Sequence, residues 1–148
     1  MAQLSFHIPL GTITLSEDDG HIVSLDEGWG RDQTETPLLV RARTLLQDYF
    51  DAVTVDLSSL PVRPYGTNYQ KRVWEEVRHI PFGQTRRYGD IAHAIGGSAQ
   101  SVGTALGANM IPLLIPCHRV VSARGSGAYS AFGGAEDKVR LLDLENGF

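Results

Sequence analysis

Cysteine is nearly absent from this 148-residue chain, which contains one, and no stretch of about 18 apolar residues occurs. One cysteine excludes an internal disulfide and a zinc site built from several cysteines. Without a long apolar stretch there is no candidate membrane-spanning helix, and the first residues lack the basic start of a secretory signal. No phosphate-binding loop, dinucleotide fingerprint or metal-ligand cluster is present. We therefore expect a cytoplasmic protein that uses no cofactor and no metal.

Positive charge is also scarce, because the formal net charge is −4. The charge is uneven, however. Residues 1–60 contain three Lys or Arg against ten Asp or Glu, whereas residues 61–148 contain ten against seven. This asymmetry favours an anionic partner for the second half of the chain, with weak to moderate and salt-sensitive binding if that partner is DNA.

Hydrophobic periodicity and turn residues predict two lobes and an α+β fold. Residues 1–60 are predicted to form a small α/β lobe, and residues 61–148 a mostly helical lobe, joined by a linker over 58–66 that contains two prolines and a glycine. The elements predicted for the first lobe are strands over 3–9, 11–16, 21–25 and 53–57 and a helix over 36–50.

The second lobe has the pattern of a helix-turn-helix, in a winged-helix-like arrangement. A helix over 88–95 is followed by Gly96-Gly97, and Ser98 is placed to cap a second helix that runs to about Leu106. Thr67 and Gln70 fit a capping box at the start of an earlier helix that ends near His79. The other predicted elements are a strand over 113–121, a loop over 124–134 and a helix over 135–145.

The cysteine, Cys117, is followed directly by His118 and Arg119 and preceded by Pro116. An imidazole and a guanidinium nearby stabilise a thiolate, which is the nucleophilic form of cysteine. The alternative is an inert cysteine that fills space in the core. The flanking His-Arg pair favours a reactive thiol.

The second helix of the helix-turn-helix has one small and almost uncharged face. Val102, Ala105 and Leu106 share the inward face at helical spacing. A glycine in mid-helix costs up to about 1 kcal/mol relative to alanine, which close approach to DNA would explain; a tolerated surface glycine is the alternative. The outward stripe consists of Gln100, Gly103, Thr104 and Gly107.

The run Pro116-Cys117-His118-Arg119-Val120 resembles the active-site signature of the O6-alkylguanine-DNA alkyltransferases, also called methylated-DNA–protein-cysteine methyltransferases. The resemblance is collinear over about residues 62–146. Further matching segments are Gly66-Thr67-Asn68-Tyr69-Gln70, Val73-Trp74, 80–85, 88–92, 109–115 and, in the last helix, Lys138, Leu141-Leu142 and Glu145.

This resemblance implies single-turnover DNA repair, in which Cys117 takes a methyl or small alkyl group from guanine O6. His118 would deprotonate Cys117 through a water molecule and would be oriented by Glu145, which is the logic of a catalytic triad. Asn109 would hold the turn before the active-site segment. Tyr88 would donate to the purine ring and help to neutralise the guanine anion that leaves.

The family also implies how the damaged base is recognised. The backbone carbonyls of Cys117 and Val120 would read the exocyclic amine, and Ser130 would face O6. The partner is expected to be double-stranded DNA with an alkylated guanine, bound by a monomer. Phosphate contacts are expected from Arg86, Arg87 and Arg124, and Arg119 is expected to pair with a carboxylate or brace the fold. Activity on O4-alkylthymine stays open.

The chain departs from the family at Gln100, where most members have an arginine that fills the space of the flipped nucleotide. Glutamine can hydrogen-bond but lacks the charge and the flat guanidinium. Two rival functions follow. One is a non-catalytic alkyltransferase-like binder, although such proteins lack the cysteine. The other is a cysteine hydrolase, which is disfavoured because neighbours on a strand point to opposite faces.

Overall fold

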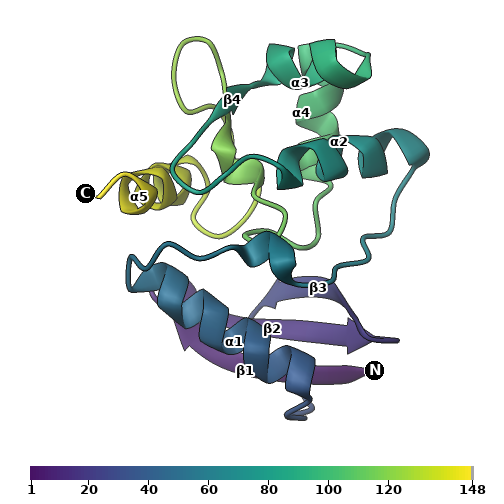
Figure 1. Cartoon of the computed structure of the whole chain (residues 1–148), viewed down its shortest axis with the longest axis vertical. Coiled ribbons are helices and arrows are strands. Elements are labelled where there is room, and N and C mark those ends of the chain that lie inside the picture. The colour runs from purple at the N-terminus through teal and green to yellow at the C-terminus, as the bar shows by residue number, and fades with distance from the viewer. Residues whose placement is uncertain (148) are drawn as a thin grey trace.

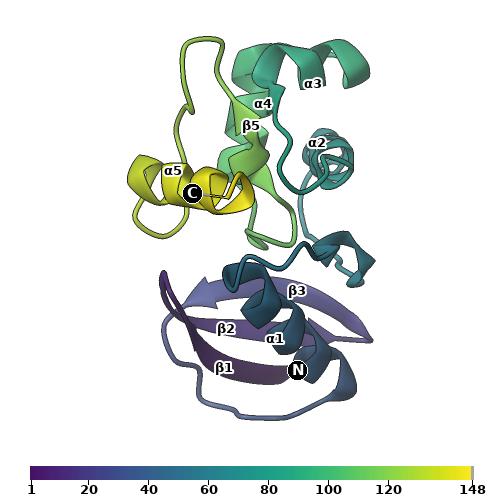
Figure 2. The ribbon, with the colours of Figure 1, turned by 60° about the vertical axis from the view of Figure 1, so that its left-hand side comes forward.

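The computed structural model describes residues 1–147 and has two lobes stacked on each other (Figure 1). The N-terminal lobe is an antiparallel sheet of order β1-β2-β3 with the helix α1 across one face (Figure 2). These elements confirm three predicted strands and the predicted helix. Their bounds are Ala2–Ile8 for β1, Gly11–Asp18 for β2, His21–Glu27 for β3 and Pro37–Phe50 for α1.

The sequence of α1 accounts for where it begins and which face it buries. Thr36 caps the helix by accepting from the Leu39 backbone N–H, and Pro37 occupies the first turn, where its missing donor costs nothing. Leu39, Ala42, Leu46 and Tyr49 then recur on one face and are fully buried.

The strand predicted over 53–57 is wrong. Asp56 accepts from the Ser58 backbone and caps the short 3-10 helix η1 (Leu57–Ser59), so the local hydrogen bond competes with strand pairing. The predicted linker is also more ordered than a spacer. The Ile22 N–H donates to the Pro61 carbonyl and the Arg63 N–H to the Ile22 carbonyl, so the chain runs beside β3 as it leaves the lobe.

The C-terminal lobe contains the predicted helix-turn-helix. The Thr67–Gln70 capping box starts α2, and Ser98 caps α4 as predicted. Gly96 and Gly97 have φ values of 93° and 95°, which L side chains rarely adopt, and a Cβ on Gly97 would lie 2.3 Å from the Tyr69 hydroxyl. The helices are α2 (Asn68–Arg78), α3 (Tyr88–Ile95), α4 (Ala99–Gly107) and α5 (Ala135–Glu145).

The active-site segment is not the strand predicted over 113–121. Leu113 has φ of 73°, and Cys117–Arg119 form the 3-10 helix η2. Only Val120–Val121 are a strand, β5, which pairs in parallel with β4 (Arg86–Arg87). Prolines 112 and 116 explain the difference, because each removes a backbone donor and fixes φ.

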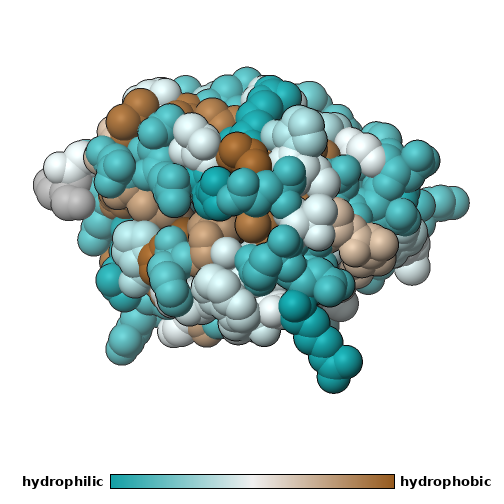
Figure 3. All heavy atoms as spheres, turned by 90° about the horizontal axis from the view of Figure 1, so that it is seen from below, coloured by the Kyte–Doolittle hydropathy of each residue, from teal (hydrophilic) through white to brown (hydrophobic). Residues whose placement is uncertain are grey.

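The two lobes share one hydrophobic core, to which Leu15 and Tyr49 contribute from the first lobe and Val73 and Ile115 from the second. The division at residue 60 stays a prediction. The underside of the N-terminal lobe is mostly hydrophilic, with separated apolar patches (Figure 3). Over residues 1–147, none of the helices has both the length and the apolar content that a membrane span needs.

Candidate active site

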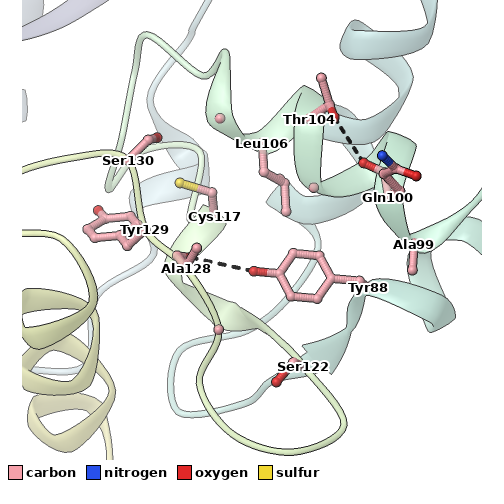
Figure 4. A pocket seen from close by; sticks show the side chains of 13 residues that line it. Tyr88, Ala99, Gln100, Thr104, Leu106, Cys117, Ser122, Ala128, Tyr129 and Ser130 are labelled. Atoms are coloured by element: carbon pink, nitrogen blue, oxygen red, sulfur yellow. Dashed lines mark hydrogen bonds between the residues drawn. The ribbon is translucent and has the colours of Figure 1, made fainter.

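A pocket of about 580 Å³ lies between α4 and the loop that follows β5 (Figure 4). Cys117 lies at its inner wall, and Tyr88 points into it from the start of α3. The outward face of α4 forms one side, and residues 127–130 of the loop form the other. The pocket therefore joins the helix-turn-helix surface to the chain's sole thiol.

Cys117 is 5% exposed. Its Sγ lies 3.3 Å from the Asn109 side-chain N–H, and the same amide donates to the Ile115 carbonyl at 3.0 Å. The side-chain oxygen Oδ1 of Asn109 accepts from the Ile111 backbone N–H, so this side chain holds both the turn and the thiol. Burial raises the pKa of the Cys117 thiol, while the Asn109 hydrogen bond and the charge of Lys138 lower it. A mainly protonated buried thiol requires a base before it can attack carbon.

His118 follows Cys117 directly in the chain, and its side chain is fully buried. Its Nε2 lies 2.5 Å from Oε2 of Glu145. Burial lowers the pKa of His118, although Glu145 acts in the opposite direction. A neutral ring facing an ionised carboxylate donates from Nε2, so Nδ1 is the unprotonated nitrogen. Nδ1 has no hydrogen-bond partner within residues 1–147, which leaves it able to accept a proton.

Glu145 ends α5 and accepts four hydrogen bonds although its side chain is fully buried. Oε1 accepts from Gly83 N–H at 3.0 Å and from Arg119 Nε at 2.8 Å. Oε2 accepts from His118 and, at 2.6 Å, from the Tyr49 hydroxyl. Burial acts to raise the pKa of Glu145, but the hydrogen bonds and charges of His118 and Arg119 outweigh it and lower the pKa to about 2. Arg119 thus pairs with a carboxylate, as expected.

Lys138 places a buried ammonium group behind the pocket. Its Nζ donates to the carbonyls of Val120 at 2.7 Å and Ala128 at 3.0 Å, and it lies 3.3 Å from the Tyr88 hydroxyl. Burial lowers the pKa of Lys138 to about 8, with a smaller opposing effect from Cys117. Burial likewise raises the pKa of Tyr88, so its hydroxyl keeps its proton and remains a donor.

The remaining predicted contacts are those to the damaged base and those to the DNA phosphates. The α4 stripe, predicted to approach DNA, and Ser130, predicted to face O6, line the pocket, whereas the Val120 carbonyl, predicted to read the base, accepts from Lys138. Arg86 donates to Glu76 at 2.8 Å, which engages the side chain expected to contact phosphate. Arg87 and Arg124 are exposed. The members of the stripe that line the pocket are Gln100, Gly103, Thr104 and Gly107.

Sequence reasoning gave no role to two residues of this site. Lys138 shares a helix face with Leu141 and Glu145, at spacings of three and seven, and a lysine on a buried face signals a specific partner. Tyr49 follows the apolar stripe of α1, and a buried tyrosine hydroxyl needs a partner. Nothing local identified that partner, which lies 96 residues further along the chain. Within residues 1–147, no group of three His, Cys, Asp or Glu is arranged to hold a metal ion.

A helix-turn-helix whose second helix borders a pocket with a buried thiol is typical of a DNA-binding protein that has a cysteine in its functional site. The chain belongs to the 6-O-methylguanine DNA methyltransferase family, whose DNA-binding-domain model matches residues 68–147. It is 40% identical over 139 residues to the methylated-DNA–protein-cysteine methyltransferase of Metallosphaera sedula, covering 93% of this chain and 88% of that protein. The constitutive methyltransferase of Bacillus subtilis is 34% identical over 152 residues, covering 93% of this chain and 90% of that protein.

The structural comparison agrees with the sequence comparison. The chain superposes on the Mycobacterium tuberculosis OGT in complex with DNA with a TM-score of 0.84 and 31% identity, covering 99% of this chain and 94% of that one. The similarity therefore includes the N-terminal lobe, which the family model leaves out.

Proposed function

We propose that this protein repairs DNA by moving a methyl or small alkyl group from guanine O6 to Sγ of Cys117. The observation that carries the proposal is the pocket itself, because one cavity unites the thiol with the outer face of α4. With α4 against DNA, a base turned out of the duplex reaches Cys117 directly.

The chemistry is a single displacement at carbon. His118 Nδ1 takes the thiol proton, through water, while Glu145 supports the imidazolium that forms. The S–C bond forms as the C–O6 bond breaks, and the guanine leaves as an anion. Tyr88 donates a proton to the purine, which makes the leaving guanine neutral, and takes a replacement proton from the Lys138 ammonium group 3.3 Å away. The thioether has no route back to a thiol here, so each molecule acts once.

The partner follows from the family and from the site. The pocket opens on the helix-turn-helix, and the half of the chain that contains it has the excess of positive charge. We propose double-stranded DNA with an alkylated guanine as the substrate, with Arg87 and Arg124 as the phosphate contacts. The requirement for a reduced thiol supports a cytoplasmic location.

Intact-protein mass spectrometry after incubation with an O6-methylguanine duplex tests this function. The expected result is a permanent gain of one methyl group, at one equivalent per protein and located on Cys117. Binding without any mass change would identify a non-catalytic damage binder, and release of product over many turnovers would identify a hydrolase.

A further inference from the structure

Tyr49 belongs to the N-terminal lobe, yet its hydroxyl lies in the middle of the active-site relay. It donates to Oε2 of Glu145 at 2.6 Å and lies 3.4 Å from Nε2 of His118. The residue is fully buried. Its ring packs edge-on against Phe50 and Phe82, at centroid distances of 5.1 and 5.7 Å. The hydroxyl is therefore fixed by packing rather than free to rotate away.

We propose that Tyr49 is a positioning residue for alkyl transfer, through which the N-terminal lobe sets the orientation and the basicity of His118. This inference rests on the proposed function and adds a residue to its machinery. It also gives the N-terminal lobe a part in the chemistry.

Tyr49 and His118 share one carboxylate oxygen of Glu145 as their hydrogen-bond acceptor. The hydroxyl and the imidazole both donate to Oε2, whereas Arg119 and Gly83 occupy Oε1. A donated hydrogen bond stabilises the carboxylate charge and weakens its pull on the imidazole proton. Tyr49 thus favours the neutral ring that the chemistry needs.

Apart from Glu145, the other groups around the ring also favour the neutral form. Burial of His118 and the charges of Arg119 and Lys138 lower its pKa, and only Glu145 acts to raise it. Burial, followed by the charge of Glu145, raises the pKa of Tyr49, so its hydroxyl stays a donor across the working pH range. The titratable groups in contact with the imidazole are Tyr49 from α1 and Glu145 from α5, and the charges of Arg119 from η2 and Lys138 from α5 also act on it.

Tyr49→Phe keeps the packed ring and removes only the hydroxyl. Without that donor, the negative charge on Oε2 is less stabilised and attracts the proton of an imidazolium more strongly. The pKa of His118 should therefore rise. NMR titration of the His118 ring, assigned by its loss in His118→Asn, is expected to show this rise. Tyr69→Phe is the matched control, because its hydroxyl bonds to Ser101 and Gly96 and touches nothing in the relay. An unchanged His118 titration in Tyr49→Phe would overturn the proposal.

The kinetic counterpart is single-turnover transfer from free O6-benzylguanine between pH 5 and 9. Tyr49→Phe is expected to be about 10-fold slower at pH 7, the scale of a hydrogen bond to a charged group. The acid limb of its pH–rate profile should move to higher pH, a shift that a purely structural role would not produce. Slower transfer with an unmoved acid limb would refute the proposal.

Replacing Tyr49 with 3,5-difluorotyrosine should change the pKa of His118 in the opposite direction, and it keeps the hydroxyl. A more acidic phenol donates more strongly to Oε2, so the pKa of His118 should fall. This protein also serves if Tyr49→Phe does not fold, and a rise or no change would overturn the proposal. The NMR readouts need no alkyl transfer, so failure of the proposed function, seen as an unreactive wild type, is distinguished from failure of the tyrosine proposal.

Discussion

At the scale of single residues, the thiol and the DNA surface are separable. Cys117 contributes Sγ to the pocket, whereas the stripe on α4 is formed by other side chains. We predict that Cys117→Ala abolishes alkyl transfer and leaves binding to O6-methylguanine DNA within about threefold of the wild type, because one buried atom is removed. Mass spectrometry and a fluorescence-anisotropy titration measure the two properties. A methylated Ala variant would show that another residue accepts the group.

A second prediction for single residues concerns His118 and Glu145, the proposed relay behind the thiol. In the proposed mechanism, His118→Ala removes the base and Glu145→Gln removes the charge that supports the imidazolium, so each should slow transfer by about 10²–10⁴-fold. Glu145→Gln also leaves the buried Arg119 guanidinium without its carboxylate, which should destabilise the fold by about 3–5 kcal/mol. Single-turnover kinetics and urea unfolding check these effects. A wild-type pH–rate profile in either variant would contradict the relay.

At the scale of elements, α4 was predictable because its signals are local. Ser98 caps it, and Val102, Ala105 and Leu106 are buried as their spacing predicted. The segment over 113–121 was not, because its apolar residues favoured a strand although Pro116 lies within it and Pro112 just before it. Within this segment, Cys117–Arg119 form the 3-10 helix η2, where successive side chains point about 120° apart. This turn places Cys117 in the pocket and His118 against Glu145.

Long-range contacts explain what else the sequence left out. The helix that contains Tyr49 was predicted over 36–50, but the hydrogen-bond partner of Tyr49 comes from the opposite end of the chain. In the same way, the Val120 carbonyl accepts from Lys138, although both residues lay in predicted elements. Periodicity identifies which side chains are buried, and only the tertiary fold determines which polar groups then meet.

The element-scale prediction concerns Gln100, which is exposed on α4 and borders the pocket. Gln100→Arg should speed repair of an O6-methylguanine duplex more than reaction with free O6-benzylguanine. Flipping a base costs a few kcal/mol, and a stacked guanidinium offsets part of it. The free base needs no flipping, so it serves as the control substrate. Equal acceleration of both, or slower duplex repair, would show that Gln100 does not occupy the intercalating position.

At the scale of the whole molecule, Tyr49 of the N-terminal lobe contacts His118 and Glu145 of the C-terminal lobe. These buried contacts make the packing of the two lobes sensitive to acid. The Leu25 N–H donates to the Met110 carbonyl between the lobes, and the more exposed Arg63 pairs with Asp18, but the buried ionisable contacts centre on Glu145. Two groups there have pKa values below those of the unfolded chain, near 6.5 for histidine and 4.3 for glutamate. In both cases the unfolded state binds more protons, so stability falls as pH falls.

The lowered pKa values of His118 and Glu145 define the pH range over which the folded protein loses stability. The pKa of His118 is lowered by burial, so its contribution to stability is lost as pH decreases below about 6.5. Glu145, with a pKa of about 2, contributes above about pH 4.3 and loses that contribution as pH falls toward 2. We predict that Tm decreases measurably between pH 7.5 and 5, because protons bind to the unfolded chain in preference to the folded one over this range. Differential scanning calorimetry measures it. His118→Asn should flatten this window, whereas His93→Asn, which alters an exposed histidine on α3, should preserve it. A His118→Asn protein with the full wild-type decrease would place the acid sensitivity outside the relay.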